Sequence, residues 1–257
     1  RDGEAAVVVV GLDEDWETEG RDRDSFSLPG RQDELVAAVA AACPRTIVVV
    51  NAGSPVAMPW AEAAAALVQL WYPGQEGGRA LADVLFGDAD PGGRLPLTIP
   101  ARMEDTPAFL SCPGEALALR YDEGVFIGHR WYDARGIAPR FPFGHGLSYA
   151  RFEYGELRVA RDALRAGEPV EAEIEVTNTS ERPGVEVVQL YLAAPPGPVR
   201  RPQRVLVGFA KLRLAPGERG VARFSVPPRA LSFWDVATGA WQIAAGAYEL
   251  VAGRSSR

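Results

Sequence analysis

The first part of the chain alternates short apolar runs with segments of helical spacing. This pattern predicts strands at Ala5–Val10, Thr46–Val50 and Ala65–Trp71 and helices at Gln32–Ala42 and Glu76–Phe86. The first two strands are continuous apolar runs, which is typical of strands buried on both faces. Strands separated by helices of about ten residues pair in parallel through right-handed crossovers. Residues 1–150 are therefore predicted to form an α/β layered domain with a mostly parallel sheet.

From residue 151 onward the pattern changes to strict alternation. In Glu168–Thr177 apolar side chains alternate with glutamates, which is the period of a strand with one face in water. Turn residues divide the rest into further strands, at Val185–Leu192, Val205–Leu212, Gly220–Val226, Trp241–Ala244 and Ala247–Val251. About seven short strands with no helical pattern between them predict an antiparallel β-sandwich for residues 151–257.

Composition narrows the classes of function. The chain has 257 residues, of which 47% are apolar, enough for one large or two ordinary domains with proper cores. Its formal net charge of −7 argues against nucleic acid or an anionic membrane as the main partner. No apolar run reaches the roughly 18 residues of a membrane span.

The cysteines and histidines are too few for a metal site. The chain has two of each, none at ligand spacing, so we expect no structural zinc site. We expect no other cofactor. Cys43, at the end of an Ala-rich helix, is predicted to be a buried structural thiol, and Cys43 and Cys112 make no disulfide framework. The low cysteine count slightly favours a cytoplasmic location over secretion.

The loop Trp16–Arg23 follows the first predicted strand and is the best candidate for chemistry. Open α/β sheets present their functional groups at the carboxyl ends of the strands, and this loop carries Glu17 and Glu19 there. A loop carboxyl group with a raised pKa can act as general acid in glycosidic cleavage. Such cleavage needs a second carboxylate across the sugar, which two glutamates on one short loop can hardly provide for each other. On residues alone, a solvated charged loop is the default interpretation and a catalytic loop the alternative.

Several long, irregular motifs resemble the C-terminal part of glycoside hydrolase family 3 β-glucosidases. They are, in the family's order, WETEGRDR, SLPGRQDELV, VVVNAGSPVAMPW, WYPGQEGGRALADVLFGDADPGGRLPLTIP, RYDEGVFIGHRWYD and FPFGHGLSY. NTSERPGVEVVQLYL and LSFWDVATGAWQIAAGAYELVAG resemble the fibronectin type III-like domain that ends many members. The resemblance covers essentially the whole chain. It implies the family's α/β sandwich domain at 1–150, short of an opening strand or two, and the fibronectin type III-like β-sandwich at 151–257.

The resemblance also implies an activity and a division of labour. Family members are retaining, exo-acting enzymes that hydrolyse terminal non-reducing β-D-glycosides. An aspartate nucleophile lies on an N-terminal (β/α)8-type barrel, and the α/β domain supplies the general acid/base. Glu19, ten positions before the proline of SLPG, best matches that acid/base, with Glu17 as the runner-up because the loop length varies in the family. Trp16, Asp22 and Arg23 are then expected to orient the loop or to lie on the substrate side.

The chain departs from the family in having no barrel and no SDW nucleophile segment. The barrel is therefore expected either in the same polypeptide or in a separate chain, and a PA14-like insertion near the start of this sequence would fit the family. Arg120–Gly124 and His129–Tyr132 match family stretches near the barrel interface, and His145 is interpreted as structural. The competing hypothesis is a non-catalytic module for carbohydrate binding, through Trp234 and Trp241, or for homodimerisation.

Overall fold

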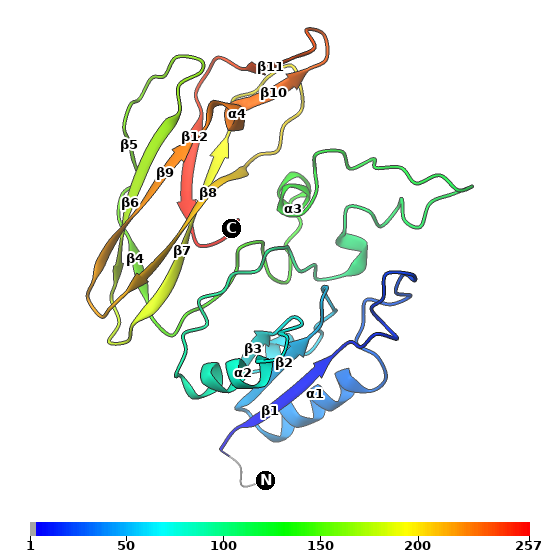
Figure 1. Cartoon of the computed structure of the whole chain (residues 1–257). Coiled ribbons are helices and arrows are strands. Elements are labelled where there is room, and N and C mark those ends of the chain that lie inside the picture. The colour runs from blue at the N-terminus through cyan, green and yellow to red at the C-terminus, as the bar shows by residue number, and fades with distance from the viewer. Residues whose placement is uncertain (1–3) are drawn as a thin grey trace. The chain divides into compact units, whose positions relative to one another are not determined.

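The computed structural model describes residues 4–257, which divide into two compact units (Figure 1). The first unit comprises the chain up to Phe86 together with Ile99–Thr106. The second comprises Gly87–Thr98 together with Pro107–Arg257. Residues 107–150 therefore pack with the unit that holds the later strands.

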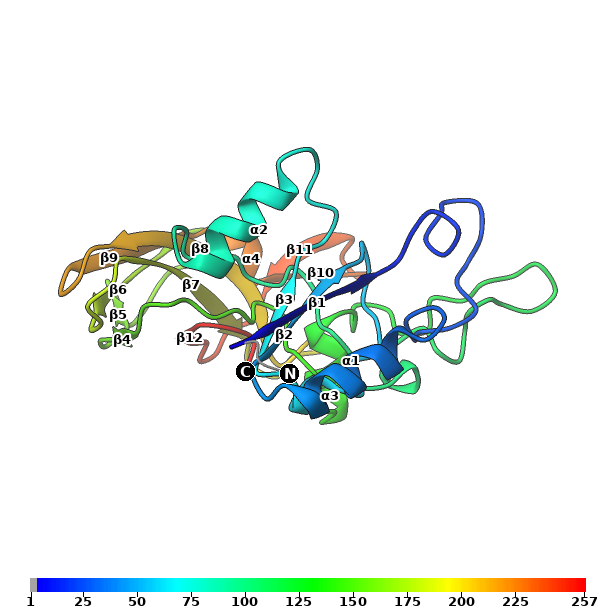
Figure 2. The ribbon, with the colours of Figure 1, turned by 90° about the horizontal axis from the view of Figure 1, so that it is seen from below.

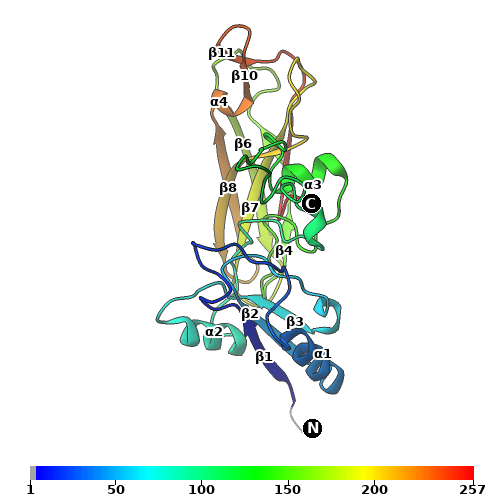
Figure 3. The same cartoon turned by 90° about the vertical axis from the view of Figure 1, so that its right-hand side faces the viewer.

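The first unit is built on a parallel sheet. Its strand order is β1 (Ala6–Gly11), β2 (Thr46–Asn51), β3 (Ala66–Gln69), and helices α1 (Gln32–Ala42) and α2 (Gly77–Phe86) lie on opposite sides of it (Figures 2 and 3). Two short 3₁₀ turns, η1 (Ala61–Ala63) and η2 (Met103–Asp105), complete the unit. The central strand β2 is buried on both faces as predicted, because α1 and α2 lie on the two opposite sides of the sheet. The α/β prediction is confirmed, although β3 is shorter than its apolar run.

The prediction that the first strand is buried on both faces is wrong. Val8 and Val10 are 7% and 3% exposed, whereas Val7 and Val9 are 50% and 58% exposed. β1 is an edge strand that pairs only with β2 within the described residues, and α1 packs against it. Valine favours strands because its branched side chain suits an extended backbone. A run of valines therefore predicts a strand but does not predict whether both of its faces are buried.

Cys43 also differs from its prediction. It is half-buried, not buried, because it caps the C-terminal end of α1, where the chain leaves the helix.

The second unit is an antiparallel β-sandwich. One sheet has the order β12 (Glu249–Gly253), β7 (Gly184–Ala193), β8 (Val205–Leu214). In the other, β6 (Val170–Asn178) pairs with β9 (Arg219–Val226) on one edge and with β4 (Phe152–Tyr154) and β5 (Arg158–Val159) on the other. A hairpin of β10 (Ser232–Asp235) and β11 (Ala240–Ile243) forms a separate two-stranded sheet.

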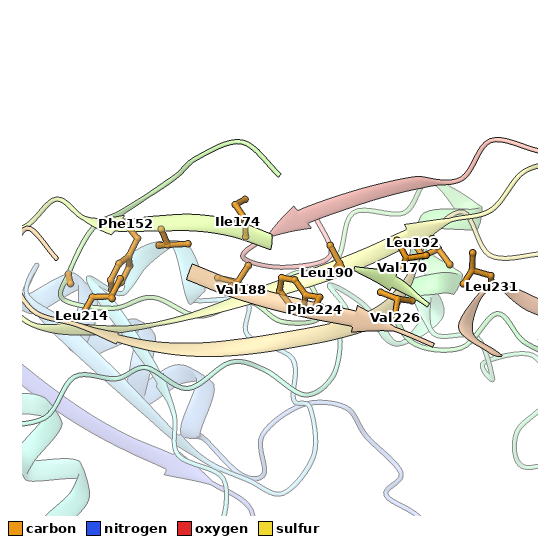
Figure 4. Close-up of a cluster of buried hydrophobic side chains, with 13 residues drawn as sticks. Phe152, Val170, Ile174, Val188, Leu190, Leu192, Leu214, Phe224, Val226 and Leu231 are labelled. Atoms are coloured by element: carbon orange, nitrogen blue, oxygen red, sulfur yellow. The ribbon is translucent and has the colours of Figure 1, made fainter. Parts of the chain in front are cut away.

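The sandwich closes over a continuous hydrophobic core (Figure 4). The alternation along β6 turns its apolar residues inward, as predicted. The core side chains include Phe152, Val170, Ile174, Val188, Leu190, Leu192, Leu214, Phe224, Val226 and Leu231. The predicted antiparallel sandwich is confirmed.

Two helices of this unit carried no clear signal in the sequence. α4 (Pro228–Leu231) lies between β9 and β10, where no helix was predicted, and α3 (His129–Arg135) precedes the strands. α4 has four residues and begins at a proline, so it is too short for a helical period to appear.

The segment Gly87–Thr98, called the strap below, is tied to the sandwich through charged side chains. The Asp90 carboxylate accepts hydrogen bonds from the Ser148 hydroxyl (2.7 Å) and from the Val185 amide (2.9 Å). Arg94 Nη2 lies 2.9 Å from Glu186 Oε1, and the two side chains are only 7% and 2% exposed. A buried ion pair therefore links the strap to β7.

The two histidines of the chain make the stability of this unit depend on pH. The His129 ring stacks on Phe143 with the centroids 5.1 Å apart and meets Tyr191 edge-on at 5.9 Å. Burial lowers the pKa of His129, against the opposing charge of Asp133, and burial and Arg94 lower the pKa of His145. The unfolded chain then binds protons more readily below pH 6.5, so stability is full above that pH and is lost as the pH falls.

We therefore expect the sandwich to lose stability as the pH falls from about 6.5 to about 5.5, where most carboxylates stay ionised. His129→Phe keeps a ring in the stack but cannot be protonated, so its urea midpoint should fall less over this interval. An equal fall in the variant and the parent would contradict this role of His129.

Candidate active site

The carboxyl ends of the three parallel strands bring together segments that are distant in sequence. The loop after β1 carries Trp16–Arg23, the loop after β2 carries Gly53–Pro55, and Tyr72 follows β3. Parallel strands end at the same edge of a sheet, which is where α/β proteins place their ligands and catalytic groups. All three segments meet at one side chain, Glu17.

Glu17 is held by three donors. Its carboxylate accepts hydrogen bonds from the Gly53 amide at 2.8 Å, from the Ser54 hydroxyl and from the Tyr72 hydroxyl. Partial burial alone would raise the pKa of Glu17, but the bonds from Ser54, Tyr72 and Gly53, together with the charge of Arg23, lower it below its usual value. Glu17 is therefore an ionised acceptor at neutral pH.

Glu19 has a different environment two positions further on. Thr18 and Arg21 pair in an antiparallel bridge, and Glu19 and Gly20 form the turn between them. The Glu19 side chain is exposed, and it has no hydrogen-bond or ion-pair partner within residues 4–257. Of the two loop glutamates, Glu17 is engaged and Glu19 is free.

The other predicted loop residues differ in what they contact. Arg23 is half-buried and donates a hydrogen bond from Nη2 to the Pro55 carbonyl at 2.8 Å. Arg21 donates to the Asp15 carbonyl. Asp22 is exposed and, in the part of the chain that the structure describes, has no polar partner. Trp16 is 39% exposed.

The remaining candidates belong to the second unit. Tyr132 is buried in it, and His145 stacks on Phe141 with the centroids 5.2 Å apart. Trp234 and Trp241 face each other across the β10–β11 hairpin, 45% and 49% exposed, with centroids 5.4 Å apart.

The sequence did not assign the three residues that bind Glu17. Gly53, Ser54 and Tyr72 follow β2 and β3 directly, so the rule that parallel strands end at one edge could have grouped them with the Glu17 loop. Trp71, before Tyr72, has a φ of +57°, a left-handed conformation that costs a residue other than glycine roughly 1–3 kcal/mol. Such strain persists only where surrounding contacts fix it.

Neither a metal centre nor a membrane helix is found among the described residues. No group of three or more histidine, cysteine, aspartate or glutamate side chains in residues 4–257 could hold a metal ion. None of the helices in this range has both the length and the hydropathy that crossing a bilayer requires.

The fold and the loop define an α/β unit with a free carboxyl group at the carboxyl edge of its sheet, joined in sequence to an antiparallel sandwich. Residues 1–149 match the glycosyl hydrolase family 3 C-terminal domain, and residues 186–256 match the fibronectin type III-like domain. The chain therefore belongs to glycosyl hydrolase family 3, which confirms the resemblance noted in its motifs.

Similar proteins carry the same region within longer chains. The chain is 47% identical over 238 residues to a probable beta-glucosidase I from Aspergillus terreus, covering 90% of this chain and 28% of that protein. The crystal structure of DesR, a beta-glucosidase from Streptomyces venezuelae in complex with D-glucose, superimposes with a TM-score of 0.93 at 41% identity, over 99% of this chain and 32% of that one. A Bifidobacterium adolescentis GH3 beta-glucosidase gives a TM-score of 0.95 at 40% identity, over 100% and 38%. The chain thus spans about a third of the length of these relatives.

Proposed function

We propose that this chain is the C-terminal portion of a retaining, exo-acting β-glucosidase, and that Glu19 is its general acid/base. The observation that carries the assignment is the contrast between the two loop glutamates. Three donors hold Glu17 as an ionised acceptor, whereas Glu19 lies exposed and unengaged on the tip of a turn. In such an enzyme Glu19 first protonates the glycosidic oxygen of a terminal β-D-glucoside and later removes a proton from water.

The nucleophile has to come from outside this chain. A retaining glycosidase needs two carboxyl groups about 5–5.5 Å apart that act on the sugar together. Glu17 lies on the same short loop as Glu19, and its carboxylate is already bound by Gly53, Ser54 and Tyr72, so it can hardly serve as the nucleophile. The relatives are about three times as long, which leaves room for the N-terminal barrel with an aspartate nucleophile. We propose that this barrel is the partner that faces Glu19, in the same polypeptide or as a second chain.

An exposed apolar segment of the second unit supports a missing partner. Leu110, Leu117 and Tyr121 are 94%, 110% and 76% exposed, and Phe109, Leu119, Val125 and Ile127 are also exposed. Apolar side chains gathered in this way are typical of an interface. Leu117 lies on a turn in which Ala116 and Leu117 both have positive φ, at 48° and 64°. The Leu117 side chain is therefore exposed to solvent from a strained stretch of backbone. We propose that the barrel covers this segment.

The remaining loop residues have supporting roles in this proposal. The bond from Arg23 to the Pro55 carbonyl holds the loop, and the half-exposed ring of Trp16 offers an apolar face on which a sugar can stack. Asp22 is close enough in sequence to orient the turn or to contact the substrate.

The reaction is tested by comparing this chain with the complete enzyme on an aryl β-D-glucoside. We expect turnover only with the complete enzyme, and proton NMR should show β-glucose as the first product, before mutarotation. A first product with the α configuration, or turnover by this chain alone at the rate of the complete enzyme, would refute the proposal.

The alternative, a carbohydrate-binding or dimerisation module, has one observation in its favour, the half-exposed Trp234 and Trp241. Against it, the guanidinium of Arg229 lies 3.0 Å from the Trp241 ring centroid and occupies one face of that ring. Gel electrophoresis through β-glucan separates the two functions. A retardation of this chain that Trp234→Ala abolishes would favour the binding module.

A further inference from the structure

The turn that carries Glu19 is attached to the sheet on both sides. Immediately before the turn, Glu17 binds Gly53 and Ser54, and shortly after it Arg23 binds Pro55. Both attachments reach the same three-residue segment after β2. Glu19 therefore lies on a short turn whose two ends are both bound to the loop that follows β2.

The backbone around Glu17 is shaped for this attachment. A Cβ at Gly53 would lie 2.7 Å from Tyr72 Cε2 and 3.1 Å from Glu17 Oε2, so a side chain there would displace the carboxylate or the ring. Ala52, the preceding residue, has its carbonyl fixed by Gln69 Nε2 at 3.1 Å. On the β3 side, the left-handed conformation of Trp71 precedes Tyr72. Gly53 after β2 and the strained Trp71 after β3 therefore both help to place the groups that bind the Glu17 carboxylate.

The protonation states of Tyr72 and Glu17 preserve the hydrogen bond between them at neutral pH. Burial raises the pKa of Tyr72, and the hydrogen bond and charge of Glu17 raise it further, so the phenol stays a neutral donor. The pKa of Glu17 is lowered, so its carboxylate stays an acceptor. A general acid needs the opposite shift, which makes Glu17 suited to anchoring and unsuited to proton donation.

We propose that Glu17 is a positioning residue for the general acid/base, which it holds through the bonds to Gly53, Ser54 and Tyr72. This inference rests on the proposed role of Glu19. A positioning residue acts on the step that its partner performs, which here is protonation of the leaving group. Loss of the anchor should therefore slow substrates that need protonation and spare those that do not.

The test compares leaving groups in the complete enzyme. For Glu17→Gln, kcat/KM should fall about tenfold or more on cellobiose. The same constant for 2,4-dinitrophenyl β-D-glucoside, whose leaving group needs no proton, should fall much less. Tyr72→Phe and Ser54→Ala, which each remove one donor, should show the same selectivity in weaker form. Glu14→Gln, at an exposed position of the same loop, is the control and should leave both substrates unchanged.

A double variant separates positioning from general structural damage. Because Glu17 acts through Glu19, adding Glu17→Gln to Glu19→Gln should change kcat/KM on cellobiose by less than about twofold. Equal losses on both substrates, or a full further loss in the Glu19→Gln background, would overturn the positioning role. If Glu17→Gln does not fold, Tyr72→Phe carries the same comparison.

Azide distinguishes this failure from failure of the proposed function. If Glu17→Ala forms β-glucosyl azide and Glu19→Ala does not, Glu17 is itself the acid/base and the assignment of Glu19 is wrong. If Glu19→Ala alone forms the azide, the assignment of Glu19 holds, and the leaving-group comparison decides the role of Glu17.

Discussion

Replacing Glu19 with alanine in the complete enzyme should lower kcat/KM for cellobiose by about 10²–10⁴-fold, the usual contribution of general acid–base catalysis. Expulsion of a sugar alkoxide needs a proton at the moment the bond breaks, and within residues 4–257 Glu19 is the one of the two loop glutamates whose carboxyl group is free. With 2,4-dinitrophenyl β-D-glucoside the first step needs no proton, so the glucosyl-enzyme should form and then accumulate.

The accumulated intermediate makes the prediction specific. Water attacks it slowly without a general base, whereas azide needs no deprotonation and fits where the carboxyl group was removed. Azide should therefore restore turnover of the activated substrate by Glu19→Ala and give β-glucosyl azide as product. Glu14→Ala is the matched control and should neither lose activity nor yield the azide. Hydrolysis of cellobiose by Glu19→Ala at the parent rate would show that Glu19 is not the acid.

Replacing Arg94 with methionine should destabilise the second unit by about 3–5 kcal/mol. Arg94 and Glu186 are 7% and 2% exposed and 2.9 Å apart, so removal of one charge leaves the other buried without its main partner. Glu186→Met should have an effect of similar size. The double variant should lose less than the sum of the two single losses, because two methionines leave no unpaired charge in the core.

Hydrogen exchange of the β7 amides measures this loss in the unit concerned. Arg219→Met is the control. The pair of Arg219 and Glu175 lies in the same unit at 3.4 Å, but its side chains are 70% and 49% exposed, so its loss should cost less than about 1 kcal/mol. Equal effects of Arg94→Met and Arg219→Met would contradict the importance of the buried pair.

The sequence predicted those helices and strands that are long enough for their hydrophobic period to be recognised. The alternation along β6 and the helical spacing of α1 gave both elements to within a few residues. α4 and β5 were missed, because elements of four and two residues show no period. The exposure of Val7 was mispredicted for another reason, since an apolar run cannot tell a central strand from an edge strand.

The candidate site was only partly readable from the sequence. The motif WETEGRDR singled out the loop and ranked Glu19 above Glu17, but it did not show what distinguishes them. That difference arises from Ser54 and Tyr72, which lie 37 and 55 positions from Glu17 in the chain and reach it only because three strands end together. The predicted parallel sheet places these segments at one edge, but the sequence pattern did not show which of their side chains would meet.

Within residues 4–257 one edge of β1 has no partner strand, and this bears on any experiment with this polypeptide alone. The free backbone groups of this edge and the solvent-facing Val7 and Val9 form a template that another copy can extend by strand addition. A dimer formed in this way buries the edge of β1, so its existence would carry no information on any other interface of the chain. Val9→Lys places a charge beside that edge, so an association that is lost in this variant can be recognised as strand addition to β1.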